Sequence, residues 1–208
     1  EVRTPLAGIK GYAQLLGEKI GDDRLRGFSS RIVQETIRLE SLVNDLLDYV
    51  HRDEPKGECA VLDEQLFHDS WATAAEDTKV QTVKLALSLP PGVMVACRRE
   101  RIRQMLINVF SNALQAAPPE GSIETTVKED RKEAVLKIRD TGPGFSQEAL
   151  PRVFDPFFTT RSRGSGLGLA VCRKIAEGCG GGISAANAEE GGAVVTIRLP
   201  LCRERKSS

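Results

Sequence analysis

Residues 154–169 read FDPFFTTRSRGSGLGL, and this glycine-rich stretch decides between the folds that the chain can adopt. Glycines at the start of a helix leave backbone N–H groups free, and the helix dipole there favours phosphate. A dinucleotide-binding fold needs a strand directly before such glycines, and residues 154–163 have no strand pattern. No Gly-Lys-Ser/Thr follows the glycines, which excludes a P-loop. The stretch therefore predicts a phosphate-binding helix start in a different fold.

The segments on both sides of this stretch mix strand and helix patterns. Residues of alternating polarity predict strands, and apolar residues three and four apart predict helices. Asp63 is the predicted cap of the helix that starts at this residue. Because strand and helix do not alternate strictly, the sequence predicts an α+β sandwich with a mostly antiparallel sheet and helices on one face. The expected strands are 58–62, 82–89, 122–130, 133–140, 182–188 and 193–200, and the expected helices are 63–78, 99–117 and 166–180.

Residues 1–52 differ from the rest because they contain only helical patterns. The short turn GDDR (21–24) between two such patterns predicts an antiparallel hairpin. A lone hairpin leaves an apolar face exposed, so we expect two copies to form a four-helix bundle. The alternative is that the hairpin packs on the rest of its own chain. The polar residues 53–57 are then a linker, 58–201 a second domain and 202–208 a tail.

The composition argues against several classes of function. Apolar residues make up 40% of the 208 and charged residues 28%, as in ordinary soluble proteins. The formal net charge is +0, so we expect no nucleic-acid partner. The chain has neither a signal peptide nor an apolar run of roughly 18 residues. We therefore expect a cytoplasmic location, with a membrane anchor only in an upstream region.

The five cysteines carry no CxxC pair. An odd and unpatterned set of this kind predicts reduced thiols in a cytosolic compartment. His51 and His68 have no ligand-like spacing to the cysteines, so we expect no zinc site.

Two groups of polar residues indicate a nucleotide with a metal ion. Asn108 and Asn112 lie four apart on one face of a predicted helix, where their carbonyl oxygens can coordinate a hard cation. Asp140 ends a predicted strand, and its carboxylate can accept a hydrogen bond from an exocyclic amine. Gly142 and Gly144 let the backbone turn sharply and approach a flat ring. Taken alone, the asparagines also fit a solvated polar stripe, and the second group fits an ordinary Asp-Thr-Gly turn.

The phenylalanine-rich loop between Gly144 and Gly164 predicts a lid. Long loops bounded by glycines often close over a site, and the aromatic side chains, Phe154 among them, would attach this one to the domain. Arg161 lies in the same loop and can reach a terminal phosphate. The alternative is a structured loop whose phenylalanines fill the core.

Taken in order, these stretches resemble one family. NVFSNALQAA (108–117), DTGPGF (140–145), FDPFFTT (154–160) and GSGLGLAVCRKIAEGCGGGI (164–183) are similar to the asparagine, first glycine, phenylalanine and second glycine boxes of sensor histidine kinases. NALQAA followed by FDPFFTTR is most similar to the nitrogen-regulation subgroup. The opening stretch EVRTPLAGIKGYAQLL resembles the segment directly after the phospho-accepting histidine. The resemblance covers nearly the whole chain.

The resemblance implies a dimerisation and histidine-phosphotransfer hairpin followed by a GHKL-type (Bergerat) ATP-binding domain of a two-component system. It implies ATP and Mg²⁺ as cofactors, autophosphorylation on histidine, and transfer of the phosphoryl group to the aspartate of a response-regulator receiver domain. It also implies a homodimer. Asp140 would bind the adenine amine, and Asn112 with Asn108 would bind the metal. The residues implied to contact the nucleotide are Asn108, Asn112, Asp140, Gly142, Gly144, Phe154, Arg161, Gly164, Gly166, Leu167 and Gly168.

The same resemblance places the phospho-accepting histidine immediately before Glu1. Glu1 would then take a proton from the imidazole as a general base. Thr4, one helical turn after the acceptor, would position water to dephosphorylate the regulator. Pro5 removes a backbone donor and can bend the helix at this point. Neither remaining histidine is expected to replace the acceptor.

Relatives with a similar ATP-binding fold that hydrolyse ATP carry a glutamate four residues before the metal-binding asparagine. Here that residue is Asn108, and a neutral amide cannot act as the base, which favours phosphotransfer. Gln115 stands where many kinases have lysine, so Arg161 is expected to take more of the phosphate contact. Two alternatives stay open: a nucleotide-binding dimeric scaffold without transfer, and a module that only dephosphorylates the regulator.

Overall fold

The computed structural model describes residues 3–50, 58–80, 82–161 and 164–202. The chain divides into two compact units, Glu1–His51 and Arg52–Ser208, and each is described by itself. The prediction of a helical hairpin followed by a mixed domain with a mostly antiparallel sheet is confirmed. The finer division into linker, domain and tail stays a prediction.

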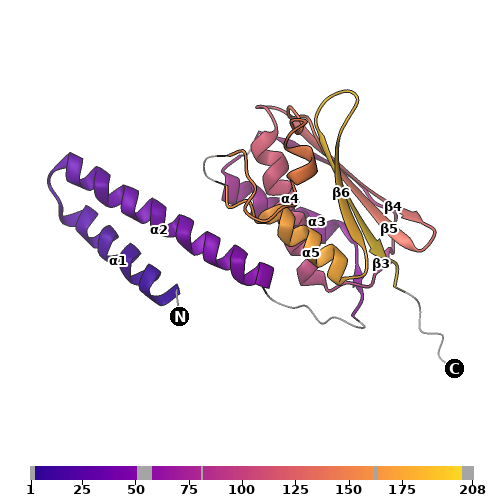
Figure 1. Ribbon diagram of the computed structural model, residues 1–208, viewed down its shortest axis with the longest axis horizontal. Helices are drawn as coiled ribbons and strands as arrows, with labels where there is room; N and C mark the ends of the chain where they lie inside the picture. The colour runs from indigo at the N-terminus through magenta and orange to yellow at the C-terminus, as the bar shows by residue number, and fades with distance from the viewer. Residues whose placement is uncertain (1–2, 51–57, 81, 162–163, 203–208) are drawn as a thin grey trace. The chain divides into compact units, whose positions relative to one another are not determined.

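The first unit is an antiparallel pair of helices, α1 (Arg3–Lys19) and α2 (Asp23–Val50), as Figure 1 shows. The turn between them ends at Asp22, whose Oδ1 accepts hydrogen bonds from the backbone N–H groups of Arg24 (2.8 Å) and Leu25 (3.2 Å). This is the capping that starts a helix. The helices approach closely further along, where the Ser29 hydroxyl donates to the Ala13 carbonyl oxygen. A Cβ added to Gly17 would lie 2.9 Å from the Ser29 Oγ, so a larger residue there would push the Ser29 hydroxyl from its place.

The hairpin buries few of its apolar side chains. Among the side chains that the structure describes here, the buried ones are Leu6, Ala13, Ser29 and Thr36. Large apolar side chains are exposed along both helices, and Tyr12 is 73% exposed. Two helices alone therefore do not cover their apolar surface. The exposed residues are Ile9, Tyr12, Leu15, Leu16, Leu25, Phe28, Ile32, Ile37, Leu39, Leu46 and Leu47.

The second unit is built on a five-stranded sheet in the order β2-β4-β5-β7-β6. All neighbours are antiparallel except β2 and β4, which run parallel. A short charged turn joins β4 to β5, and Arg131 in this turn has a φ of 58°. The strands are β2 (Lys84–Ser88), β4 (Ser122–Asp130), β5 (Glu133–Asp140), β6 (Gly182–Asn187) and β7 (Ala193–Pro200).

Three helices cover one face of this sheet: α3 (Glu64–Thr78), α4 (Arg99–Ala116) and α5 (Gly168–Gly178), as Figure 1 shows. The predicted cap at Asp63 is confirmed, because its carboxylate accepts the Leu66 N–H at 2.8 Å. The same carboxylate receives two hydrogen bonds from Arg99, at 2.8 and 2.9 Å, which ties the start of α3 to the start of α4.

The core lies between the sheet and the helices. Every second residue of a strand and one face of each helix point into it. On β5 the buried series Ala134, Leu136 and Ile138 continues in phase to Asp140. Because strand side chains alternate between faces, the carboxylate points to the same side as the core residues. The inward residues of the other elements are Ala193, Val195, Ile197 and Leu199 of β7, and Ile102, Met105, Leu106, Val109, Phe110, Ala113 and Leu114 of α4.

Two short elements were not predicted. Met94–Val95 forms β3, which pairs with β1 (Ala60–Val61) in a separate two-stranded sheet. Leu150–Arg152 forms a single 3₁₀ turn, η1, inside the predicted lid loop. Neither segment is long enough to show a periodic pattern, so the sequence gives no signal for it.

The prediction of reduced thiols is contradicted for four of the five cysteines. Disulfides join Cys59 to Cys202 and Cys97 to Cys179, with Cα–Cα distances of 6.0 and 5.3 Å. Within the described residues Cys172 is the free cysteine, and its burial raises the pKa of its thiol to about 12. The prediction failed because the partners are 143 and 82 residues apart, so that only the fold brings them together.

Candidate functional site

Asp140 is held rigidly at the end of β5 and is only 5% exposed. Its Oδ1 accepts hydrogen bonds from the backbone N–H groups of Gly142, at 2.8 Å, and Ala193, at 3.1 Å. Two glycines make this packing possible: a Cβ on Gly142 would lie 2.7 Å from the Ala116 carbonyl oxygen, and one on Gly192 would overlap the Asp140 carbonyl oxygen. Among the described residues nothing donates to the second carboxylate oxygen, so that oxygen can accept from a ligand.

The turn after Asp140 is fixed by a residue that sequence reasoning missed. The Asn187 side chain, at the end of β6, accepts the Phe145 N–H at 2.7 Å and donates to the Phe145 carbonyl at 2.8 Å. Gly144 has a φ of 76°, and a Cβ there would lie 2.7 Å from the Asn187 Oδ1. The glycine is therefore needed for its backbone angle and for this contact. A lone asparagine in a strand pattern carries no signal of such a role.

The two predicted metal-binding asparagines lie one turn apart on α4. Asn108 Nδ2 donates to the Gly168 carbonyl at 3.3 Å, which joins the middle of α4 to the first residue of α5. Asn112 Oδ1 accepts a hydrogen bond from Arg161 Nη1 at 3.1 Å. Because Asn112 is four residues before Ala116, it lies at the end of α4 that contacts the Asp140–Gly142 turn.

The glycine-rich stretch opens α5 as predicted. Gly166 has a φ of 68°, and a Cβ there would lie 2.5 Å from the Phe157 carbonyl carbon, so this position requires glycine. Leu167 is fully buried and anchors the start of the helix, while its N–H is bonded to Ser165 Oγ at 3.2 Å. The N–H groups of Gly168, Leu169 and Ala170 have no acceptor among the described residues, as is usual at a helix start.

The loop residues divide between buried and exposed positions. Phe154 and Phe158 are half-buried, and the Arg152 guanidinium lies 4.4 Å from the Phe158 ring centre. Phe157 is 63% exposed and has a φ of 66°, so it does not fill the core. A Cβ on Gly164 would lie 2.7 Å from Thr159 Oγ1.

Arg161 connects the loop to the end of α4. Its Nη1 donates to Asn112 Oδ1 (3.1 Å) and to Gln115 Oε1 (2.7 Å), and its Nη2 donates to the Asn112 carbonyl oxygen (3.0 Å). Burial lowers the pKa of Arg161, and the negative charge of Asp140 acts in the opposite direction. Arg161 is thus bonded to Asn112 while the charge of Asp140 acts on it, which links the two predicted groups of polar residues.

Hydrogen bonds therefore join Arg161 to Asn112, Gly142 to Asp140 and Asn108 to Gly168, and the charge of Asp140 acts on Arg161. Within the described residues, Phe154 makes no hydrogen bond or ring contact to any of them. Glu1 lies outside the described residues, and of Thr4 the structure describes only the helical backbone of α1.

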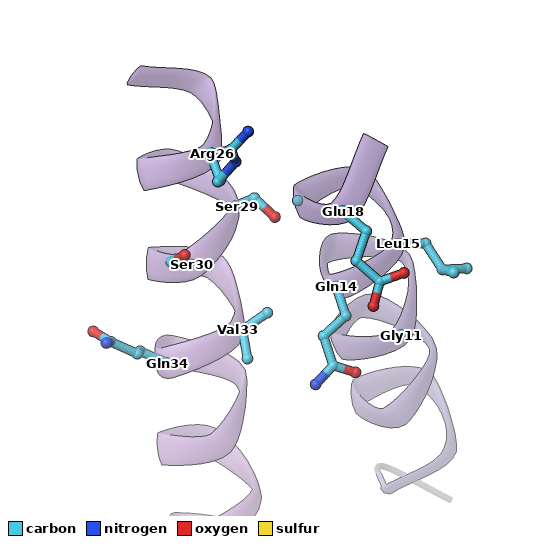
Figure 2. A pocket seen from close by; sticks show the side chains of 10 residues that line it. Gly11, Gln14, Leu15, Glu18, Arg26, Ser29, Ser30, Val33 and Gln34 are labelled. Carbon is cyan, nitrogen blue, oxygen red and sulfur yellow. The ribbon is translucent and has the colours of Figure 1, made fainter. Parts of the chain in front are cut away.

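The hairpin carries a shallow hollow of its own near the turn. It is lined by Gly11, Gln14 and Glu18 from α1, and by Ser29, Ser30 and Val33 from α2. Figure 2 shows Ser29 and Val33 of α2 pointing toward α1, and the Gln14 and Glu18 side chains on α1. The mixture of amide, carboxylate and hydroxyl groups beside the exposed apolar residues suits a protein partner better than a small apolar ligand.

Two family models match the chain. Residues 1–55 match the His Kinase A (phospho-acceptor) domain, and residues 97–203 match the histidine kinase-, DNA gyrase B- and HSP90-like ATPase family. The chain belongs to the sensor histidine kinases. Membership of the nitrogen-regulation subgroup stays a prediction.

Known sensor histidine kinases resemble this kinase over most of its length. It is 36% identical over 214 residues to the sensor protein KdpD of Clostridium acetobutylicum, covering 96% of this chain and 23% of that protein. Full-length ShkA in complex with AMPPNP has a TM-score of 0.77 at 26% identity, over 97% of this chain and 44% of that one.

ThkA in complex with the response regulator protein TrrA has a TM-score of 0.71 at 27% identity, over 99% of this chain and 60% of that one. The kinase chain therefore spans less than two thirds of each of these proteins. In the part that the structure describes, no helix is both long enough and apolar enough for a membrane span.

Proposed function

We propose that this chain is the cytoplasmic catalytic portion of a sensor histidine kinase. It uses ATP to phosphorylate a histidine and passes the phosphoryl group to an aspartate of a response regulator. The observation that carries the proposal is that Arg161 bonds Asn112 at the end of α4, while the negative charge of Asp140 at the end of β5 acts on the same guanidinium. An amide, a guanidinium and a buried carboxylate are the groups needed for metal, phosphate and adenine.

The nucleotide fits the groups at this site. Asp140 has one oxygen fixed by two backbone N–H groups and a second that can accept the adenine amine. The N–H groups at the start of α5 and the Arg161 guanidinium supply positive charge for the phosphates. Adenine recognition and phosphate binding then come from β5 and from α5 with its preceding loop.

Magnesium fits the oxygen donors on α4. The amide oxygens of Asn112 and Asn108 are hard, neutral ligands of the kind that Mg²⁺ accepts when phosphate oxygens complete its shell. When bound, the ion neutralises charge that develops on the transferred group. The metal and its ligands stay a proposal.

Phosphotransfer is favoured over hydrolysis by the residue at 108. Its side-chain amide bonds the Gly168 carbonyl and has no basic form at neutral pH, so it cannot activate water. The nucleophile would instead be the histidine that the family pattern places directly before Glu1. Glu1 would accept the imidazole proton, and Thr4 would position water in the reverse reaction.

The hairpin supports the proposed partners. Its exposed apolar residues on both helices, Leu16 and Phe28 among them, would be covered in a four-helix bundle with a second copy. The response regulator would dock on the hairpin near the phosphohistidine, as the ThkA–TrrA complex shows that a kinase of this family binds a regulator.

A transfer experiment distinguishes the proposal from its alternatives. The full-length kinase carrying Asp140→Asn, which retains the acceptor histidine, is mixed with this chain and with ATP labelled on the γ-phosphate. We expect label on the Asp140→Asn protein, and much less on that protein when it is incubated alone at an ATP concentration that it binds poorly. Nucleotide binding without label on the acceptor would support the dimeric scaffold instead. Regulator dephosphorylation that depends on Thr4, with no labelling at all, would support a module that only acts as a phosphatase.

A further inference from the structure

Gln115 is an exposed residue of the last turn of α4 that makes the shortest hydrogen bond to Arg161. The Gln115 Oε1 accepts from Arg161 Nη1 at 2.7 Å, against 3.1 Å for Asn112 Oδ1 and 3.0 Å for the Asn112 carbonyl. Three acceptors thus orient the two terminal nitrogens of one guanidinium. Such a side chain keeps few of its rotamers, so it is ordered before any ligand arrives.

The hydrogen-bond partners of Arg161 carry no negative charge, and the charge of Asp140 acts on the guanidinium without a hydrogen bond among the described residues. All three acceptors are neutral amide or carbonyl oxygens, and among the described residues no carboxylate bonds the guanidinium. Its half-buried position makes an unpaired charge costly, because burial disfavours the charged form. An anionic group from a ligand would relieve this cost, and a terminal phosphate matches the planar fork of the guanidinium.

One of the three acceptors cannot serve two cations at once. If Asn112 Oδ1 coordinates Mg²⁺, the Arg161 N–H can no longer point at that oxygen, because a guanidinium and a divalent ion repel one another. Arg161 is then held by the Asn112 carbonyl and by Gln115. Gln115 therefore becomes the only side chain among the described residues that still orients the arginine.

We propose that Gln115 is a positioning residue for Arg161. It keeps the guanidinium at the end of α4 when the Asn112 oxygen turns to the metal, so that Arg161 meets the terminal phosphate of a nucleoside triphosphate. Gln115 thereby sets the preference for ATP over ADP, which lacks that phosphate. This inference rests on the proposed binding of ATP and Mg²⁺.

The test measures equilibrium binding of ATP and of ADP to the full chain by titration calorimetry. Gln115→Met keeps the length of the side chain and removes the acceptor. Gln65→Met is the matched control, because Gln65 is an exposed residue of α3 with no contact to this site among the described residues. In Mg²⁺ we expect Gln115→Met to weaken ATP binding about fivefold, the value of one hydrogen bond, and to change ADP binding less than twofold.

Two further measurements separate positioning from a general structural effect. In EDTA the Asn112 oxygen stays on Arg161, so Gln115→Met should weaken ATP binding less than it does in Mg²⁺. In an Arg161→Met background, adding Gln115→Met should change ATP binding by less than twofold, because a residue that acts through Arg161 has nothing left to orient.

The inference is overturned if Gln115→Met lowers ATP and ADP affinity equally, or if its effect is the same in EDTA or persists in the Arg161→Met background. These outcomes leave the proposed function intact, because the wild type still binds ATP. If the wild type binds neither nucleotide, the proposed function fails, and the role of Gln115 fails with it.

Discussion

Asp140→Asn should reverse the base preference of the nucleotide site. The substitution keeps the size of the side chain and removes its charge. The backbone N–H groups of Gly142 and Ala193 both donate to one side-chain oxygen, at 2.8 and 3.1 Å, so the single oxygen of asparagine must stay on them. The NH₂ group is then forced into the place of the carboxylate oxygen that we propose for the adenine amine.

The expected magnitude follows from this forced orientation. Both the new NH₂ group and the adenine amine are donors, so the hydrogen bond is lost and the two groups oppose each other. A hydrogen bond to a charged group contributes about 1.5–3 kcal/mol, which corresponds to about 10- to 150-fold weaker ATP binding. Inosine triphosphate presents an oxygen in place of the amine, and the asparagine NH₂ can donate to it. Binding of inosine triphosphate should therefore become stronger than in the wild type.

Titration calorimetry with ATP and with inosine triphosphate measures both changes on one protein. The opposite signs make the test specific, because a misfolded variant would lose both nucleotides. A thermal melt shows that the variant is folded. The assignment of adenine to Asp140 is refuted if Asp140→Asn binds ATP within twofold of the wild type, or if both nucleotides weaken together in a folded protein.

Three further predictions test the supports of the site. Gly142→Ala should weaken ATP binding at least tenfold, because its Cβ would lie 2.7 Å from the Ala116 carbonyl oxygen. Gly168→Ala should bind ATP within threefold of the wild type, because the atom nearest to its Cβ would be 3.8 Å away. Titration calorimetry compares the two variants. Asp63→Ala should lower the free energy of unfolding by about 1–2 kcal/mol, because it removes a helix cap and a partly exposed ion pair. The hydrogen bond from Arg99 lowers the pKa of Asp63 from 3.8. The stability that the Asp63 carboxylate contributes is therefore present above about pH 4 and is lost as the pH falls through the lowered pKa. Urea melts of the wild type and of Asp63→Ala at about pH 7 and about pH 3 measure this loss. In denaturant without reductant, one thiol per chain should react with an alkylating reagent, and after reduction five should react. Mass spectrometry counts the labels. Five labels before reduction would contradict the two disulfides.

The sequence predicted the parts of the site that depend on local pattern. Asp140 was predicted at the end of a strand and does end β5, and the four-residue spacing places Asn108 and Asn112 on one side of α4. The glycine positions were also visible, since a glycine at a helix start or after a strand usually serves a positive φ or a close backbone approach. These inferences needed no knowledge of which elements pack together.

The contacts between distant segments were beyond the sequence. Asn187 and Ala193 support the Asp140 turn from more than 40 residues away, and nothing in their own neighbourhood distinguishes them from other strand residues. The partner of each disulfide cysteine is equally hidden, because five cysteines without a spacing pattern allow many pairings. Arg161 was predicted to reach phosphate, but its bonds to Asn112 and Gln115 depend on how the loop folds back on α4.

Asn108 links the choice of reaction to the stability of the domain. Its Nδ2 donates to the Gly168 carbonyl at 3.3 Å, so the side chain joins α4 to the residue that begins the phosphate-binding helix. A carboxylate at 108 has no donor and would repel that carbonyl oxygen. Asn108→Asp should therefore lower the free energy of unfolding by about 1–3 kcal/mol, the cost of breaking the bond and leaving half-buried acceptors opposed. Urea melts measure the free energy of unfolding. Asn112→Asp is the matched control, because the side-chain oxygen at 112 accepts a hydrogen bond from Arg161 and keeps that bond when it becomes charged. If the two variants are equally stable, the hydrogen bond from the amide at 108 is not what holds α5 against α4.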